Sequence, residues 1–152
     1  MKAERIPEEP PSVRQQVAAL PYRLGAGVEI MVVSSRETRR WVLPKGWPMK
    51  GKSLHASAER EALEEAGIEG VISAQALGQY HYVKRMKNGS TPLCAVSVYP
   101  LLVTRQRETW RESAERTTRW MPVEAAAQAV HEPDLREIIL AFGERILAGA
   151  KS

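Results

Sequence analysis

Short stretches rich in small and β-branched residues alternate along this chain with loops and with longer stretches of helical pattern. Residues 17–23 and 27–35 are typical of a pair of strands, and residues 41–43 form a third apolar stretch that stops at Pro44. Residues 44–51 contain two prolines and two glycines, which indicates a loop. The first part of the chain therefore predicts strands that lead into a loop.

A helix is predicted directly after this loop. Ser53 can cap its first turn, and Gly67 supplies its C-terminal stop. Between them an apolar residue recurs at every fourth position, at Leu54, Ala58, Ala62 and Ala66. This spacing places the four side chains on one face, by which we expect the helix to pack on a core.

A second group of strands is predicted in residues 71–85 and 92–104, which flank the hairpin signal Asn88-Gly89. Tyr80 and Tyr82 share one face of their strand, because strand side chains alternate. The aromatic side chains of this chain could stack on a nucleobase, although packing against the sheet is the commoner fate of such residues. The polar residues 105–119 predict a long loop.

Two further helices are predicted at residues 123–127 and from about Pro133 to Ala148, where apolar residues form a stripe. The order is strands, helix, strands, helix. The best layer arrangement for this order is a mixed α/β (α+β) fold, in which helices cover both faces of a mixed sheet.

Length and composition fit one ordinary domain. The chain has 152 residues, of which 43% are apolar and 26% charged. We expect a flexible N-terminal arm at residues 1–16 and a single domain at 17–150. No apolar run is long enough for a membrane helix, and the N-terminus lacks the apolar stretch of a secretory signal, so a cytoplasmic location is expected. The sequence leaves a monomer or a homodimer open.

The net charge of +4 favours anionic partners such as phosphates, but it is too small to indicate a nucleic acid. Three of the acidic residues, Glu61, Glu64 and Glu65, have the spacing that places them on one helical face. On a solvated surface, a like-charge pair at this spacing costs only ~0.2–0.5 kcal/mol. In a cleft, carboxylates ~5–6 Å apart repel by ~3 kcal/mol and would need a cation, for which oxygen ligands suit Mg²⁺ or Mn²⁺.

The residues around these carboxylates decide between the two interpretations. Gly46 is followed by five residues, Lys52, seven residues, and then the sequence REALEEAGI from Arg60 to Ile68. This pattern resembles the Nudix box, G-x5-E-x7-REUxEExGU with U an aliphatic residue, at every specified position except Lys52, if Ala62 is counted as aliphatic. The resemblance implies a Nudix-type α/β/α sandwich over about residues 17–148.

The resemblance also implies a function: a hydrolase that depends on a divalent metal, Mg²⁺ or Mn²⁺, and cleaves a diphosphate (pyrophosphate) linkage. By the resemblance, Glu61, Glu64 and Glu65 are metal ligands, and Glu64, Glu65 and Arg60 belong to the catalytic group. The family often supplies a further carboxylate from a loop before the last strand. Glu112 and Glu115 are the candidates for it, and Glu115 is our choice.

Lys52 is the departure from the pattern, because it replaces a glutamate that in the family holds the box arginine or a metal-bound water. Arg60 then needs another partner, for which Glu64 or Glu59 is available. Three ligands remain, so activity is expected to survive. The alternative is a Nudix-fold protein that binds or senses a phosphorylated ligand with weak or no hydrolysis.

The segment from Arg40 to Pro48 resembles the branch of the family that hydrolyses diphosphoinositol polyphosphates and diadenosine polyphosphates. The expected partner is therefore a small-molecule polyphosphate: a nucleoside diphosphate derivative, a dinucleoside polyphosphate or an inositol pyrophosphate. The candidate substrate-binding residues are the cations near the presumed cleft and the glycine of the box, namely Lys45, Arg40, Arg23, Lys84 and Gly46.

Overall fold

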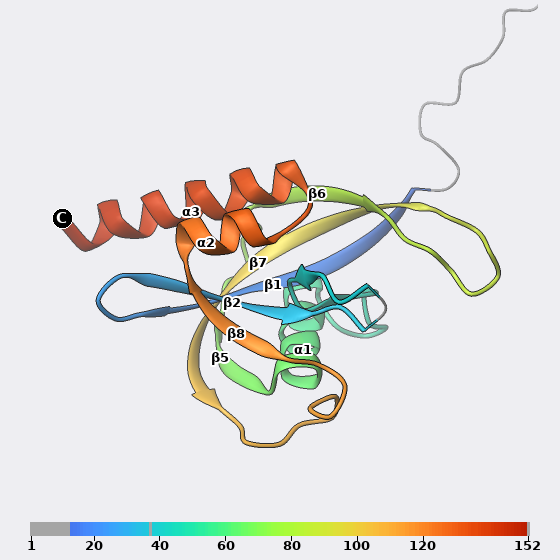
Figure 1. The fold of residues 1–152 in the computed structure, drawn as a ribbon, viewed down its shortest axis with the longest axis horizontal. Helices are drawn as coiled ribbons and strands as arrows, with labels where there is room; N and C mark the ends of the chain where they lie inside the picture. The colour runs from blue at the N-terminus through green and yellow to red at the C-terminus, as the bar shows by residue number, and fades with distance from the viewer. Residues whose placement is uncertain (1–12, 37, 152) are drawn as a thin grey trace, which may run out of the picture.

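The computed structural model describes residues 13–36 and 38–151 (Figure 1). In these residues eleven elements follow one another: β1 (Arg14–Leu24), β2 (Val28–Ser34), β3 (Trp41–Val42), β4 (Lys45–Gly46), α1 (Leu54–Ala66), β5 (Ile68–Ile72), β6 (Gly78–Val83), β7 (Leu93–Gln106), β8 (Thr118–Pro122), α2 (Val123–Ala129) and α3 (Pro133–Lys151). None of the helices in the described part of the chain is long and apolar enough to cross a membrane.

All the strands belong to one mixed sheet, whose main path runs β3-β2-β1-β7-β5. β1 and β7 form its centre and pair in parallel, from Arg14 opposite Cys94 to Tyr22 opposite Leu102. The other strand pairs are antiparallel. β7 is long enough to pair with β6 along its first half and with β5 along its last residues.

Two hydrophobic cores lie on the two faces of this sheet. Successive side chains of a strand point to opposite faces, so in β1 Val17 and Ala19 join the core under α1, while Ala18 and Leu20 join the core under α2 and α3. Figure 1 shows α2 and α3 on one side of the sheet and α1 on the other. The predicted sandwich of helices on both faces of a mixed sheet is confirmed.

The sequence accounts well for the limits of α1. The Ser53 hydroxyl oxygen accepts a hydrogen bond from the Ala56 N–H at 3.2 Å, and Gly67 ends the helix in the left-handed conformation at φ +69°. Three of the four predicted apolar positions, Ala58, Ala62 and Ala66, are completely buried. Leu54 is instead 37% exposed, because it lies in the first turn, beyond the part of the helix that packs on the sheet.

Other boundaries differ from the prediction. β1 begins at Arg14, so its first three residues belong to the segment predicted as an arm, and residues 1–12 lie outside the described part. The strand predicted at 71–85 is two strands, because β5 and β6 pair with different parts of β7. The loop predicted at 105–119 is shorter, since β7 continues to Gln106 and β8 begins at Thr118, where it pairs with β2.

Candidate active site

The acidic face of α1 borders a cavity of about 360 Å³. Its other walls come from β1, β4, β6 and the loop between β7 and β8. The side chains that line it are mostly charged or polar: Gln16, Ser35, Arg36, Val42, Lys45, Gly46, Trp47, Glu61, Glu64, Glu65, Tyr82, Lys84, Arg111, Glu112 and Arg116. We call this space the carboxylate cavity. It brings together the three glutamates of α1, as the sequence predicts.

Glu61 and Glu65 form a close pair within the carboxylate cavity. Their carboxyl groups share a hydrogen bond, and Glu65 is only 5% exposed. Burial, the hydrogen bond and the neighbouring negative charges raise the pKa of Glu61 to about 8. Burial also raises the pKa of Glu65, although the positive charge of Arg116 opposes this rise. At neutral pH the pair therefore retains a proton when no cation is bound.

Gly46 lies directly beneath this pair. A Cβ atom at position 46 would stand only 2.2 Å from Oε2 of Glu61. The same short strand, β4, pairs with β1 at Val17 and Ala18 and thereby holds the glycine next to α1. Gly46, which the sequence suggests as a substrate-binding residue, leaves room for the Glu61 carboxylate in its observed position, because a side chain here would have to displace it.

Glu64 is held differently, by two guanidinium groups. Its Oε2 lies 2.7 Å from Nε of Arg60, and its Oε1 lies 3.5 Å from Nη1 of Arg111. Arg60 therefore pairs with Glu64, one of the two carboxylates that the sequence suggests in place of the missing box glutamate. The side chain of Glu64 is only 17% exposed, so this charge is largely withdrawn from water.

The donor set fits a divalent metal ion, but it is not fully assembled. Within residues 13–36 and 38–151, no three acidic, histidine or cysteine side chains converge as a ready metal site. Both oxygens of Glu64 are paired with guanidinium groups instead. A cation at Glu61 and Glu65 would stabilise the ionised carboxylates, whose burial raises both pKa values, and carboxylate oxygens suit Mg²⁺ or Mn²⁺. Glu64 could join them once it is released by Arg60.

The loop between β7 and β8 supplies the fourth carboxylate of the cavity, and that residue is Glu112. Its Oε1 lies 2.6 Å from Nε of Arg116, and its backbone N–H donates to the carbonyl of Glu64 at 3.1 Å. Glu115, our choice from the sequence, instead forms an exposed ion pair with Arg36 at 3.3 Å and does not line the cavity. The backbone N–H groups of Glu115 and Arg116 both donate to the carbonyl of Glu112 in a helical turn, and of these two residues only Arg116 lines the cavity.

Arg116 was not among the residues predicted from the sequence. Its side chain is 11% exposed and reaches Glu112, Glu65 and the carbonyl of Ser34. The i, i+4 spacing of Glu112 and Arg116 was a readable signal for an ion pair on a helical turn. That the turn faces α1 depends on the fold and had no signal in the sequence.

The predicted substrate-binding cations are dispersed. Lys45 and Lys84 line the carboxylate cavity. The ammonium of Lys45 lies 5.0 Å from the centre of the Tyr82 ring, and burial lowers the pKa of Lys45. Arg40 does not reach this cavity. Arg23 is wrong as a site residue: it lies near the other end of β1, paired with Glu29 at 2.7 Å.

A second cavity, of about 580 Å³, adjoins the first and shares with it Ser35, Val42, Lys45, Tyr82 and Lys84. Arg40 lines this second space together with Arg85 and Lys87, while Glu132 is its one acidic residue among those described. We call it the basic cavity. A ligand that spans both cavities would have one end at the carboxylates and the other among cations.

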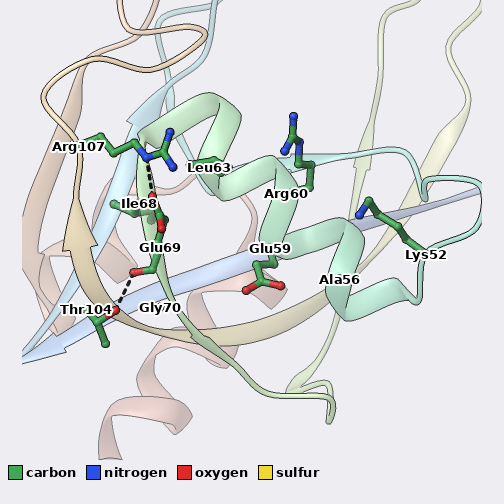
Figure 2. Close-up of a pocket in the computed structure, with 10 residues that line it drawn as sticks. All are labelled: Lys52, Ala56, Glu59, Arg60, Leu63, Ile68, Glu69, Gly70, Thr104 and Arg107. Carbon is green, nitrogen blue, oxygen red and sulfur yellow. Dashed lines mark hydrogen bonds and ion pairs between the residues drawn. The ribbon is translucent and has the colours of Figure 1, made fainter.

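Lys52 lies away from both spaces. It lines a separate groove of about 400 Å³ on the other side of α1, together with Glu59, Arg60 and Arg107 (Figure 2). The figure shows its ammonium on the same side of the helix as Arg60. The lysine at the departing position of the motif therefore does not place its charge in the carboxylate cavity.

Comparison with known proteins identifies the family. Residues 14–142 match the family described as NUDIX domain. The chain belongs to the Nudix hydrolase family. Nudix hydrolase 21, chloroplastic, from Arabidopsis thaliana is 31% identical over 137 residues, which cover 87% of this chain and 67% of that protein. Diphosphoinositol polyphosphate phosphohydrolase 3-beta from Bos taurus is 30% identical over 130 residues, which cover 82% of this chain and 75% of that protein.

A solved structure shows the same fold. The Ap4A hydrolase of C. elegans, in a binary complex, superposes with a TM-score of 0.66 at 20% identity, over 90% of this chain and 98% of that one. The Nudix fold expected from the motif is therefore confirmed, as is the resemblance to the branch that contains the diphosphoinositol polyphosphate phosphohydrolases. The chloroplastic name of one relative does not support a cytoplasmic location here, which stays a prediction.

Proposed function

We propose that this Nudix protein hydrolyses a diphosphate linkage in a phosphorylated small molecule and that it requires Mg²⁺ or Mn²⁺. One observation carries the proposal: four carboxylates and several cations from separate elements of the fold line a single cavity. Such an arrangement suits neither a solvated surface nor a hydrophobic ligand. It matches a ligand that combines bound cations with phosphate oxygens.

The residues divide into two roles in this proposal. Glu61 and Glu65, with Glu64, hold the divalent ion, which supplies positive charge to the phosphate oxygens and makes water more acidic. Lys45 and Lys84, which line the same cavity, bind and orient the phosphate groups.

Glu112 is the proposed proton acceptor of the reaction. It lines the cavity, and its Oε1 lies 2.6 Å from Nε of Arg116, which orients the carboxylate. From this loop, in the proposal, it takes a proton from the water that attacks a phosphorus atom. Arg60 acts in this scheme on Glu64, the side chain that it touches.

The non-reacting part of the substrate is proposed to occupy the basic cavity, where Arg40 contributes to its binding. The names of the relatives suggest inositol pyrophosphates, and the similar C. elegans structure suggests dinucleoside polyphosphates. Tyr80 is buried, and the ammonium of Lys45 already lies over the ring of Tyr82, so neither ring offers a free face for a nucleobase. Trp47 is 37% exposed and also lines the carboxylate cavity, but the ammonium of Lys84 lies 5.9 Å from the centre of its ring, so its ring too is already contacted by a lysine.

The test is a hydrolysis screen with Mg²⁺ or Mn²⁺ over nucleoside diphosphate derivatives, dinucleoside polyphosphates and inositol pyrophosphates, with identification of the products. Glu64→Gln and Glu65→Gln should each lower turnover by ~10²-fold or more, because a metal site loses at least this much when its ligands are disturbed. Glu69→Gln is the matched control, since Glu69 pairs with Arg107 outside the cavity. Unchanged turnover in both cavity variants would overturn the proposal.

A protein that binds a phosphorylated ligand without cleaving it remains the second interpretation. Its motivation was Lys52, which the structure places outside the carboxylate cavity. Tight binding of a diphosphate together with no turnover across the whole screen would favour it. If the protein hydrolyses a substrate only after the substitution Lys52→Glu, the lack of hydrolysis in the unaltered protein is due to Lys52.

A further inference from the structure

The guanidinium of Arg116 is the feature that joins the two halves of the carboxylate cavity. Its Nε lies 2.6 Å from Oε1 of Glu112, its Nη1 donates to the carbonyl of Ser34 at 3.1 Å, and its Nη2 lies 3.7 Å from Oε1 of Glu65. One buried side chain thus contacts the β7–β8 loop, strand β2 and helix α1. Each of its three nitrogen atoms has a different partner.

The loop that carries Arg116 is docked on the end of α1 by independent contacts. The indole N–H of Trp110 donates to the carbonyl of Glu65 at 3.0 Å, and the Glu112 N–H donates to the carbonyl of Glu64 at 3.1 Å. The Trp110 ring fills the space beside Gly67, where a Cβ would stand 2.5 Å from it. The backbone of the loop would therefore keep its place without the Arg116 side chain, whereas the Glu112 carboxylate would lose its fixed direction.

Charge explains why a guanidinium is needed at this point. Glu112 and Glu65 are both largely buried, with 17% and 7% of their side chains exposed, and two such carboxylates repel each other. A planar group with donors on three nitrogens can bridge two carboxylates and a carbonyl, while the single ammonium of a lysine cannot keep all three contacts.

We propose that Arg116 is a positioning residue for hydrolysis, which holds the carboxylate of Glu112 at a fixed place opposite Glu65. This inference rests on the proposed function. It differs from a role in substrate binding, because each nitrogen of the guanidinium is already engaged by a carboxylate or a carbonyl of the protein. Loss of the side chain should therefore act on the rate of the chemical step rather than on the affinity for the substrate.

The kinetic test compares Arg116→Gln, Arg116→Lys and Glu112→Gln with the unaltered protein. We expect kcat to fall by ~10- to 10²-fold in both Arg116 variants, with KM changed less than ~3-fold, because misplacing a reacting group by ~1 Å has an effect of this size. Arg107→Gln, which removes the guanidinium of another ion pair on the same loop, should leave both constants unchanged. A rise in KM with kcat retained would overturn the inference in favour of direct substrate contact.

A double-mutant cycle gives the decisive comparison. If Arg116 acts through Glu112, the double variant Arg116→Gln/Glu112→Gln should be no more than ~3-fold slower than Glu112→Gln alone, because coupled residues are not additive. Multiplied losses in the double variant would overturn the inference. Thermal melts of each variant separate a loss of folding from a loss of positioning.

A readout independent of turnover keeps this inference apart from the proposed function. The Nε–H proton of Arg116, bonded to a buried carboxylate, should give a resolved and slowly exchanging NMR signal that shifts or disappears in Glu112→Gln. If the unaltered protein hydrolyses nothing while this signal behaves as expected, the proposed function fails but the contact stands. A signal that is unaffected by Glu112→Gln would refute the positioning contact itself.

Discussion

Without a divalent metal ion, raising the pH should destabilise this protein through Glu61. In the folded chain the pKa of Glu61 is raised to about 8, chiefly by burial and then by its contact with Glu65. In the unfolded chain it returns to about its ordinary value near 4.5. A carboxyl group whose pKa is raised by folding favours the folded state only while it is protonated. The contribution is therefore complete below pH ~4.5 and is lost as the pH rises through ~8.

The magnitude follows from the difference between the two pKa values. The two pKa values differ by ~3.5, which corresponds to ~4.8 kcal/mol of folding free energy at ~1.36 kcal/mol for a pKa difference of one. Glu61 is only partly buried, so solvent screening reduces this figure, and we take about half of it, ~2 kcal/mol. For a chain of this size ~1 kcal/mol corresponds to ~2–4 °C in Tm, which gives an expected change of ~4–8 °C.

The assay is thermal unfolding in a chelator between pH 4.5 and 8.5, for the unaltered protein and for Glu61→Gln. A glutamine amide can still donate a hydrogen bond to Glu65 but carries no charge at any pH. We expect similar melting temperatures at pH 4.5 and a Tm higher by ~4–8 °C in the variant at pH 8.5. Glu124→Gln, an exposed position on α2, is the control and should follow the unaltered protein at every pH.

The comparison between the variants isolates Glu61 from the other groups that titrate. If the difference in Tm between the unaltered protein and Glu61→Gln does not change with pH, the argument about its burial is refuted. Addition of Mg²⁺ or Mn²⁺ at pH 8.5 should raise the Tm of the unaltered protein more than that of the variant, because only the unaltered protein offers the metal a carboxylate at position 61.

Two further changes test the neighbourhood of α1. Gly46→Ala should displace the Glu61 carboxylate by steric contact and lower kcat by ~10-fold or more. Tm should stay within ~3 °C, because the displaced group is the end of a flexible side chain. An unchanged kcat would contradict this reasoning. Lys52→Glu should offer Arg60 another carboxylate and strengthen Mn²⁺ binding by ~2- to 5-fold, which is the value of one exposed ion pair. The affinity is measured by calorimetry, with Lys50→Glu as a charge-matched control. Equal affinities in the two variants would contradict this expectation.

Local pattern was sufficient to predict α1 and the carboxylates that it carries. The cap at Ser53 and the stop at Gly67 act through hydrogen bonds and backbone angles within a few residues, so the sequence determines them almost alone. The alternation in the strands was equally local, and it placed Tyr80 and Tyr82 on one face, where their rings stack at 6.4 Å.

The sequence did not predict which segments far apart along the chain come into contact in the fold. The choice between Glu112 and Glu115 depends on which side of a turn faces α1, and that is decided by Trp110 docking at the end of the helix. Arg23 was a reasonable cation by charge, but its distance from the site follows from its place in β1. Arg116 had no apparent role until a fold brought its loop next to Glu65.

The same packing that fixes the fold also fixes α1 and thereby the backbone positions of its carboxylates. Alanines on the opposite face of the helix are completely buried, and their small side chains let the backbone of α1 lie close to the sheet. At its C-terminal end the helix is held by Trp110 and by the Glu112 N–H. Glu61 and Glu65 lie one turn apart on this fixed helix, and the burial of their side chains raises the pKa of each. The hydrophobic core thereby holds in place the carboxylates that we propose as ligands of a divalent cation.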